Sequence, residues 1–266
     1  EDGGTLCVPD CTGKECGPDG CGGTCGPPCP DGEGGGPAGT CEPGTEPFPA
    51  CGGEGHFAYT NAGCDFWAVD LRNADLSDGG AYLNAQIQPF AVVVSNTSET
   101  WSVDVILTEP DGTVHTASIP GQSLHVFELP PDNGIEGTGR TNSAYRIESS
   151  SPIVAYQFNP LDNANVLSND ASVLLPVSEL GTEYYAMTVE HFSAHATHPL
   201  AQFPGYITLV GVQPEGTQVT VTPTALTAAG ENLPAMNPGQ ATTVTVALNE
   251  VIQIETEALG GTGSGG

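Results

Sequence analysis

Short runs of alternating apolar and polar residues follow one another from about Phe57 onward. A period of two is typical of strands with one face in a core, and turn residues bound each run. No stretch shows a clear helical period, apart from one expected helical turn at Ser178–Leu180. The predicted strands are Phe66–Leu71, Leu83–Gln88, Phe90–Ser95, Trp101–Thr108, Val114–Ile119, Ser123–Leu129, Ala144–Ser149, Ile153–Phe158, Ala171–Leu175, Glu183–Val189, Tyr206–Val212, Gln218–Thr222, Thr242–Leu248 and Val251–Thr256. This spacing predicts an all-β protein built from tandem antiparallel β-sandwich modules.

The chain divides into four regions that differ in amino-acid composition and pattern. Residues 1–29 are a disulfide-rich module, and residues 30–56 are a Gly/Pro-rich linker. The only large apolar side chains in these 56 residues are Leu6, Val8 and Phe48, which are too few to form a core. We therefore expect this part to be largely irregular and held by covalent cross-links. Residues 57–190 are expected to form a first β-sandwich, and residues 191–266 a second, incomplete one.

Nine cysteines indicate an oxidising compartment. Cys51 and Cys64 are expected to pair, and Cys41 is the candidate for a free or intermolecular thiol. The other six can close the N-terminal module in any of about 15 connectivities. Those six are Cys7, Cys11, Cys16, Cys21, Cys25 and Cys29.

The charge balance excludes several partners. Four Lys and Arg residues stand against 32 Asp and Glu, which gives a net charge of -28. Such a chain is repelled by nucleic acid and by anionic lipid. No apolar run approaches the roughly 18 residues that a membrane-spanning helix needs. Glu1 is expected to be a mature end after processing. With the cysteines, these features predict an extracellular or cell-surface protein.

A weak internal repeat links the two predicted sandwiches. Val94–Val105 aligns without gaps on Val210–Val221, and two similar hairpins could also produce this by chance. The first copy continues into a hairpin, Ala144–Phe158, and the second copy stops before its counterpart. We therefore expect the second sandwich to lack two strands. Further sequence or a strand from a neighbouring molecule would cover its open edge.

Several stretches are similar to the N-terminal domain of the IgGFc-binding protein family. They are SPIVAYQFNPLDNANVLSNDASVLLP (151–176), LGTEYYAM (180–187) and PGYITLV (204–210), and the resemblance spans roughly residues 57–260. Gly13–Gly26 resembles a cysteine-rich element that precedes such domains in bacterial, myxobacterial-type surface proteins. The resemblance implies a secreted or surface protein that binds something. It supplies no ligand motif, so antibody binding is not transferred.

Candidate ligands for metals have simpler explanations. Asp162, Asn163, Asn165 and Asp170 offer oxygen ligands for Ca²⁺, but Asx residues also form turns by bonding to nearby backbone, which we favour. The same holds for the group Asp70, Asn73, Asp75 and Asp78. His191, His195 and His198 could bind Zn²⁺ if they were on a helix, but their surroundings favour a surface loop. We expect no cofactor other than, at most, Ca²⁺.

Two functional hypotheses remain, and neither is an enzyme, because no nucleophile elbow, P-loop or dinucleotide motif is present. The first is a structural protein that assembles with copies of itself into an extracellular filament or layer, through exchange of strands or linkers. The incomplete second sandwich and the odd cysteine motivate it. The second is an extracellular adhesion module that binds a glycoprotein or glycan.

Overall fold

The computed structural model describes residues 11–12, 33–35, 41–43, 51, 61–75, 83–99, 101–131, 134–166, 169–188, 192–195 and 198–257. The protein is all-β, as predicted: these residues form antiparallel sheets and a single 3₁₀ turn, η1 (Val177–Glu179). That turn overlaps the helical turn expected at Ser178–Leu180. None of the helical structure in these ranges is long and apolar enough to cross a membrane.

The N-terminal part is described at only a few places. The strands β1 (Glu33–Gly35) and β2 (Cys41–Pro43) form a short antiparallel hairpin. A disulfide joins Cys51 to Cys64, with a Cα–Cα distance of 5.7 Å, and this is the pairing that the sequence analysis expects. Cys11 is also disulfide-bonded. The other cysteines of the N-terminal module, namely Cys7, Cys16, Cys21, Cys25 and Cys29, lie outside the described residues.

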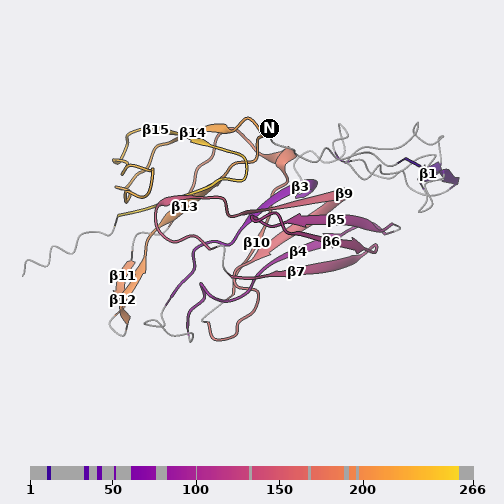
Figure 1. Ribbon diagram of the computed structural model, residues 1–266, viewed down its shortest axis with the longest axis horizontal. Helices are drawn as coiled ribbons and strands as arrows, with labels where there is room; N and C mark the ends of the chain where they lie inside the picture. The colour runs from indigo at the N-terminus through magenta and orange to yellow at the C-terminus, as the bar shows by residue number, and fades with distance from the viewer. Residues whose placement is uncertain are drawn as a thin grey trace, which may run out of the picture.

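The first sandwich is a seven-stranded sheet that folds over on itself (Figure 1). Its hydrogen-bonded order is β6-β5-β9-β4-β7, and two further strands also pair with β9. The strands are β3 (Ala62–Val69), β4 (Phe90–Asn96), β5 (Val103–Thr108), β6 (Val114–Ile119), β7 (Ser123–Leu129), β9 (Ala144–Phe158) and β10 (Ala171–Val173).

The long strand β9 holds this sandwich together. Its first part pairs with β5 through Arg146–Ser149, and its last part pairs with β4 through Val154–Phe158. Sequence reasoning predicts two strands here, because Ser149 to Pro152 resembles a turn. Instead the alternation of buried and partly exposed residues continues through this stretch. Ser149 Oγ donates to the Ser151 carbonyl oxygen at 2.8 Å, so the buried hydroxyl has a partner.

The core of the first sandwich comes from the inward residues of its strands. Phe90, Tyr145, Leu107 and Ile147 are completely buried, and the rings of Phe90 and Tyr145 lie 5.3 Å apart between centroids. Burial of apolar area on this scale is the main favourable contribution to folding. Because every second side chain of these strands points into the core, the alternation of apolar and polar residues in the sequence predicts the strands.

The second sandwich is smaller and has two separate sheets. One has the order β13-β16-β8, formed by β13 (Tyr206–Val210), β16 (Val251–Glu255) and β8 (Gly139–Thr141). The other pairs β14 (Thr217–Val221) with β15 (Thr242–Val246). Between them lies a second core, in which Leu233, Met236, Val246, Ile252 and Ile254 are buried.

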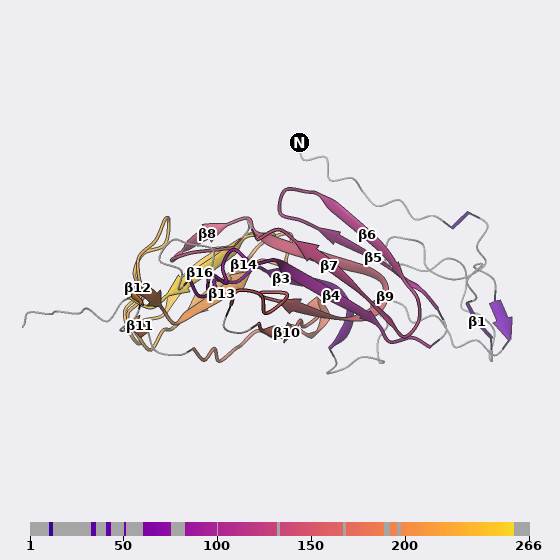
Figure 2. The same cartoon turned by 90° about the horizontal axis from the view of Figure 1, so that it is seen from below.

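The strand β8 belongs to the range expected for the first sandwich, yet it pairs with β16 of the second. This strand covers the edge of β16, whereas β13 and β14, which would flank a counterpart of β9, each pair with one strand among the described residues. A third apolar cluster packs the two sandwiches against each other. It contains buried Trp67, Val69, Ile135, Ala144 and Val251. Figure 2 shows β8 and β16 beside the end of the first sandwich.

Two predicted strands are not formed. Leu83–Gln88 makes turns, in which Asn84 Oδ1 accepts from the backbone N–H of Gln86 at 3.0 Å. Residues 183–188 are extended and exposed but lie in no strand. Conversely, β11 (Phe192–His195) and β12 (His198–Phe203) form a hairpin where sequence reasoning expects a loop.

Candidate functional site

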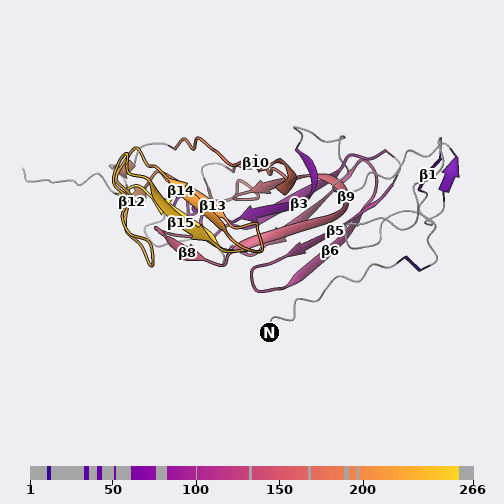
Figure 3. The same cartoon turned by 90° about the horizontal axis from the view of Figure 1, so that it is seen from above.

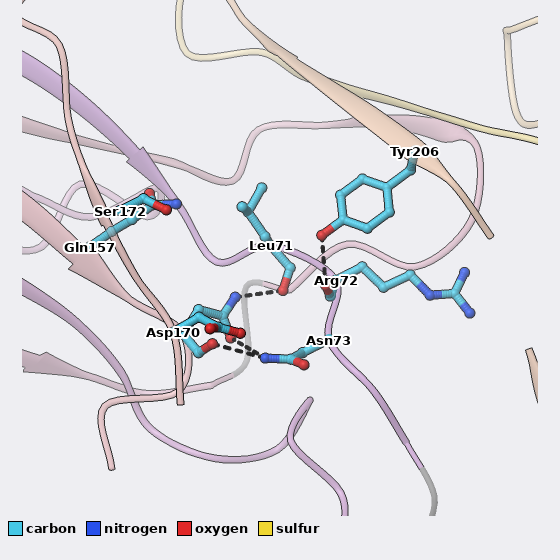
Figure 4. A pocket seen from close by; sticks show the side chains of 8 residues that line it. Leu71, Arg72, Asn73, Gln157, Asp170, Ser172 and Tyr206 are labelled. Carbon is cyan, nitrogen blue, oxygen red and sulfur yellow. Dashed lines mark hydrogen bonds between the residues drawn. The ribbon is translucent and has the colours of Figure 1, made fainter. Parts of the chain in front are cut away.

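A polar pocket lies where the two sandwiches meet (Figure 4). Its volume is about 190 Å³. The end of β3, the end of β9, β10 and the start of β13 supply its walls. The lining residues are Leu71, Arg72, Asn73, Gln157, Asn159, Asp170, Ser172 and Tyr206.

Two asparagines form the floor of the pocket and are held by hydrogen bonds. Asn73 Nδ2 donates to the carbonyl oxygen of Asn159 at 2.9 Å, and Asn159 Nδ2 donates to the carbonyl oxygen of Leu71 at 2.6 Å. Asn73 Oδ1 accepts from the backbone N–H of Ala74 at 2.7 Å. These contacts fix the shape of the pocket, and they use most of the capacity of both amides.

Arg72 and Tyr206 join the pocket to the interface between the sandwiches. The Tyr206 hydroxyl donates to the Arg72 carbonyl oxygen at 2.8 Å, and Figure 4 shows the Arg72 guanidinium directed away from the asparagines. That guanidinium bonds to Glu255 Oε1 at 2.5 Å. Burial raises the pKa of the Tyr206 phenol above 10.0; the charge of Arg72 opposes this rise and that of Glu255 adds to it.

The remaining polar groups could serve a ligand. Within the part of the chain that the structure describes, no contact engages the carboxylate of Asp170 or the hydroxyl of Ser172. The Gln157 side chain accepts one bond through Oε1, from Val69 N–H at 3.2 Å, which leaves its amide as a donor. A carboxylate, a hydroxyl and an amide beside a tyrosine ring suit a small hydroxylated molecule, such as one sugar ring.

A second candidate is the outer face of the β7-β4-β9-β10 part of the sheet. The register places Val126 opposite Val93, Val93 opposite Tyr156, and Tyr156 opposite Val173, so the four side chains form one row. Val126, Tyr156 and Val173 are between 38% and 41% exposed. We call this row the apolar row. A contiguous apolar row on the surface is typical of an interaction site.

The third candidate is the segment after η1, which we call the tyrosine segment (residues 180–188). Figures 2 and 3 show it running along the outside of the molecule from β10 toward β11 and β12. Tyr185 is 92% exposed and Met187 is 97% exposed. The Tyr184 hydroxyl accepts from the backbone N–H of Gly181 at 2.6 Å, and this contact orders the start of the segment.

Two of the four predicted Ca²⁺ ligands form turns. Asp162 Oδ1 accepts from the backbone N–H of Ala164 at 2.8 Å, and Asn165 has a φ of 57°, so both form turns. Asp170 lies at the pocket instead. No group of three or more His, Cys, Asp or Glu suited to a metal occurs among the described residues. The structure shows no turn bond for Asn163.

The other sequence candidates are placed as follows. Asn73 supports the pocket, and Asp70 is buried and accepts from Asn159 Nδ2 at 3.2 Å. Asp75 forms an isolated bridge with Asn84, whereas Asp78 and His191 lie outside the described residues. His195 and His198 are Cα partners in the register of the β11–β12 hairpin, and the segment is not a helix. Cys41 is in β2.

Sequence reasoning missed Arg72, Gln157, Ser172 and Tyr206, because they are far apart in the chain and belong to no motif. It also missed the tyrosine segment, since the alternation there predicts a strand. The two consecutive tyrosines, Tyr184 and Tyr185, are the signal in the sequence that could have revealed it.

Comparison with known proteins finds one family. Residues 170–263 match the model of the family described as IgGFc binding protein. The matched part contains β10, the tyrosine segment and most of the second sandwich, and it begins at the pocket residue Asp170. No curated protein and no solved structure matches the chain.

Proposed function

We propose that this protein is an extracellular binding module that recognises a protein or glycoprotein partner through the tyrosine segment and the adjoining apolar row. The observation that carries this proposal is the exposure of Tyr185 and Met187 inside the region that resembles a binding family. The family description names the Fc part of immunoglobulin G, which makes Fc the first partner to test.

The chemistry of the tyrosine segment suits a protein surface. Tyrosine provides a large contact area with little conformational freedom to lose, and methionine adapts to irregular surfaces. Both are enriched in protein interfaces. The protein carries a net charge of -28, so the complementary partner has basic residues around an apolar patch. Binding should then weaken as salt concentration rises.

The test is binding of the oxidised, full chain to a panel of glycoproteins that includes Fc with and without its glycans. Y185A and M187A should each weaken binding at least about tenfold, which corresponds to the loss of about 1.4 kcal/mol. V114A is the matched control, because Val114 is 56% exposed but lies on β6, outside the matched region. Unchanged affinity in both segment variants, or no binding to any panel member, contradicts the proposal.

The pocket suggests a second candidate, which is recognition of a glycan. The carboxylate of Asp170, which no described residue engages, and the hydroxyl of Ser172 favour it, and both residues belong to the matched region. D170N should then reduce binding to the glycosylated form, whereas D104N, a change at an exposed residue on β5, should not. Equal binding to both forms of the partner would assign recognition to the protein surface alone.

Self-assembly into a filament or layer has weaker support. It is motivated by the incomplete second sandwich and the odd cysteine, and one edge of that sandwich, at β16, is paired with β8 of the same chain. That the protein is not an enzyme, and that it needs no cofactor, remain predictions, as does its location outside the cell or on the cell surface.

A further inference from the structure

The two sandwiches repeat one arrangement of strands. In the first, β5 pairs with β6 and β4 pairs with β7. In the second, β14 pairs with β15 and β13 pairs with β16. Each sandwich therefore has an inner pair of strands that lies, in sequence, between the two strands of an outer pair. The second sandwich has the same inner and outer pairs as the first.

One strand breaks this correspondence. In the first sandwich β9 lies between the two pairs and bonds to both, to β5 through Arg146–Ser149 and to β4 through Val154–Phe158. In the second, β13 and β14 each pair with a single strand among the described residues, so the two sheets stay separate. The added strand β8 bonds to β16, on the other side from β13.

Side-chain burial independently indicates that the second sandwich lacks a strand at the place that β9 occupies in the first. The inward residues of β5, namely Val103, Val105 and Leu107, are 0–1% exposed, and those of β4 are fully buried. Their counterparts in the second sandwich are only partly buried: Ile207 and Leu209 on β13, and Val219 and Val221 on β14. The inward residues of β15 and β16 are buried. The incomplete burial is thus confined to the two strands that would flank a counterpart of β9.

We propose that β13 and β14 accept an extended segment of a partner polypeptide, which adds a strand between the two sheets as β9 does in the first sandwich. This proposal is independent of the tyrosine segment. The template for the occupant is β9 itself, whose buried residues include Ile147, Ile153 and Ala155 in alternation with more exposed ones. The partner segment would carry aliphatic residues at alternate positions, with no charge on that face. Backbone hydrogen bonds supply affinity, and the alternate side chains supply specificity.

The occupant is a separate polypeptide and not the β9 of a second copy. In each copy β9 is already bonded along most of its length to β3, β5 and β4. Releasing it would expose Tyr145 and Ile147, which are completely buried in the first core. That cost makes exchange of β9 between copies unfavourable.

The experiment uses a synthetic peptide with the sequence of Ala144–Phe158 as the probe, added to the full-length, oxidised protein. Amide hydrogen exchange is measured strand by strand. With the peptide at about ten times its Kd, the amides of Tyr206–Val210 and Thr217–Val221 that face the gap should exchange about tenfold more slowly. A peptide of the same composition with scrambled order, which lacks the alternation, is the control and should give no protection.

The variant L209T tests the apolar contact. Leu209 is only partly buried, so the fold should persist, which far-ultraviolet circular dichroism can verify. Peptide affinity should fall at least about tenfold. The proposal is overturned if the peptide protects neither β13 nor β14, or if it protects only β4 and β5 by displacing the native β9. Concentration-dependent dimers that protect β13 and β14 without peptide would also overturn it, because the occupant would then be a second copy.

Discussion

Glu255 is the residue whose removal should most clearly uncouple the two sandwiches. Its Oε1 accepts three bonds: from Arg72 Nη1 at 2.5 Å, from Gln253 Nε2 at 2.8 Å and from the backbone N–H of Gly137 at 3.0 Å. The side chain of Glu255 is 9% exposed and that of Arg72 is 20% exposed. The pair therefore lies largely out of water, and it connects the end of β3 to β16.

The substitution E255A removes the acceptor but leaves the donors. Arg72 keeps a charge that is mostly buried, and the backbone N–H of Gly137 loses this acceptor, whereas Gln253 Nε2 keeps its bond to the Gly137 carbonyl oxygen at 3.2 Å. Breaking a buried ion pair in this way costs about 3–5 kcal/mol. Because the Arg72 side chain can turn partly to water, we expect the lower end, a loss of about 3 kcal/mol in the free energy of unfolding.

Urea denaturation followed by tryptophan fluorescence measures this loss, because Trp67 lies in the cluster between the sandwiches. E257A is the matched control: Glu257 is exposed and the structure records only a backbone bond for it, to Leu226 at 2.9 Å, so its loss should stay within about 0.5 kcal/mol. A loss below about 1 kcal/mol for E255A would refute the idea that this carboxylate holds the two sandwiches together.

Two further predictions concern the same junction. A Cβ on Gly230 would lie 1.6 Å from the Thr138 carbonyl oxygen, whereas a Cβ on Gly139 would meet nothing within 4 Å. The substitution G230A should therefore lower the free energy of unfolding by about 2–3 kcal/mol. The control G139A should change it little. Equal effects of the two in denaturant titrations would contradict the close approach. The raised pKa of Tyr206 means that above pH 10 the unfolded chain loses this phenolic proton before the folded protein does. Stability should fall as pH rises from about 10 to that raised pKa, and Y206F should flatten this fall in unfolding curves measured across the range. An unchanged slope in Y206F would show that Tyr206 is not the group responsible.

The parts of the fold that depend on local alternation were predictable. The predicted strands Val114–Ile119 and Ser123–Leu129 coincide with β6 and β7. Both have clear alternation between turn residues, and β7 contributes Phe127 and Leu129 to the core. A strand with one buried face carries its own register in the sequence, because a shift by one residue would turn the apolar side chains outward.

The elements that depend on distant partners were not predictable. Gly139–Thr141 has no apolar alternation and becomes a strand only because it meets Val251–Gln253 across the second sandwich. In contrast, the alternation of Glu183–Val189 resembles a strand, yet residues 183–188, the described part of this stretch, belong to none of the described strands. Pairing supplies the backbone hydrogen bonds that make such a segment a strand, and sequence does not show whether a partner is present.

The sequence by itself determined the all-β class and the pairing of Cys51 with Cys64, since each follows from local composition, alternation or spacing. Only the tertiary structure decided where the candidate sites lie. Asp170 and Tyr206 meet Arg72 at the junction because two sandwiches pack end to end, and the gap beside β13 becomes visible only next to β9. Contacts between residues far apart in the chain are set by how the sheets pack against one another, and no short stretch of sequence carries that information.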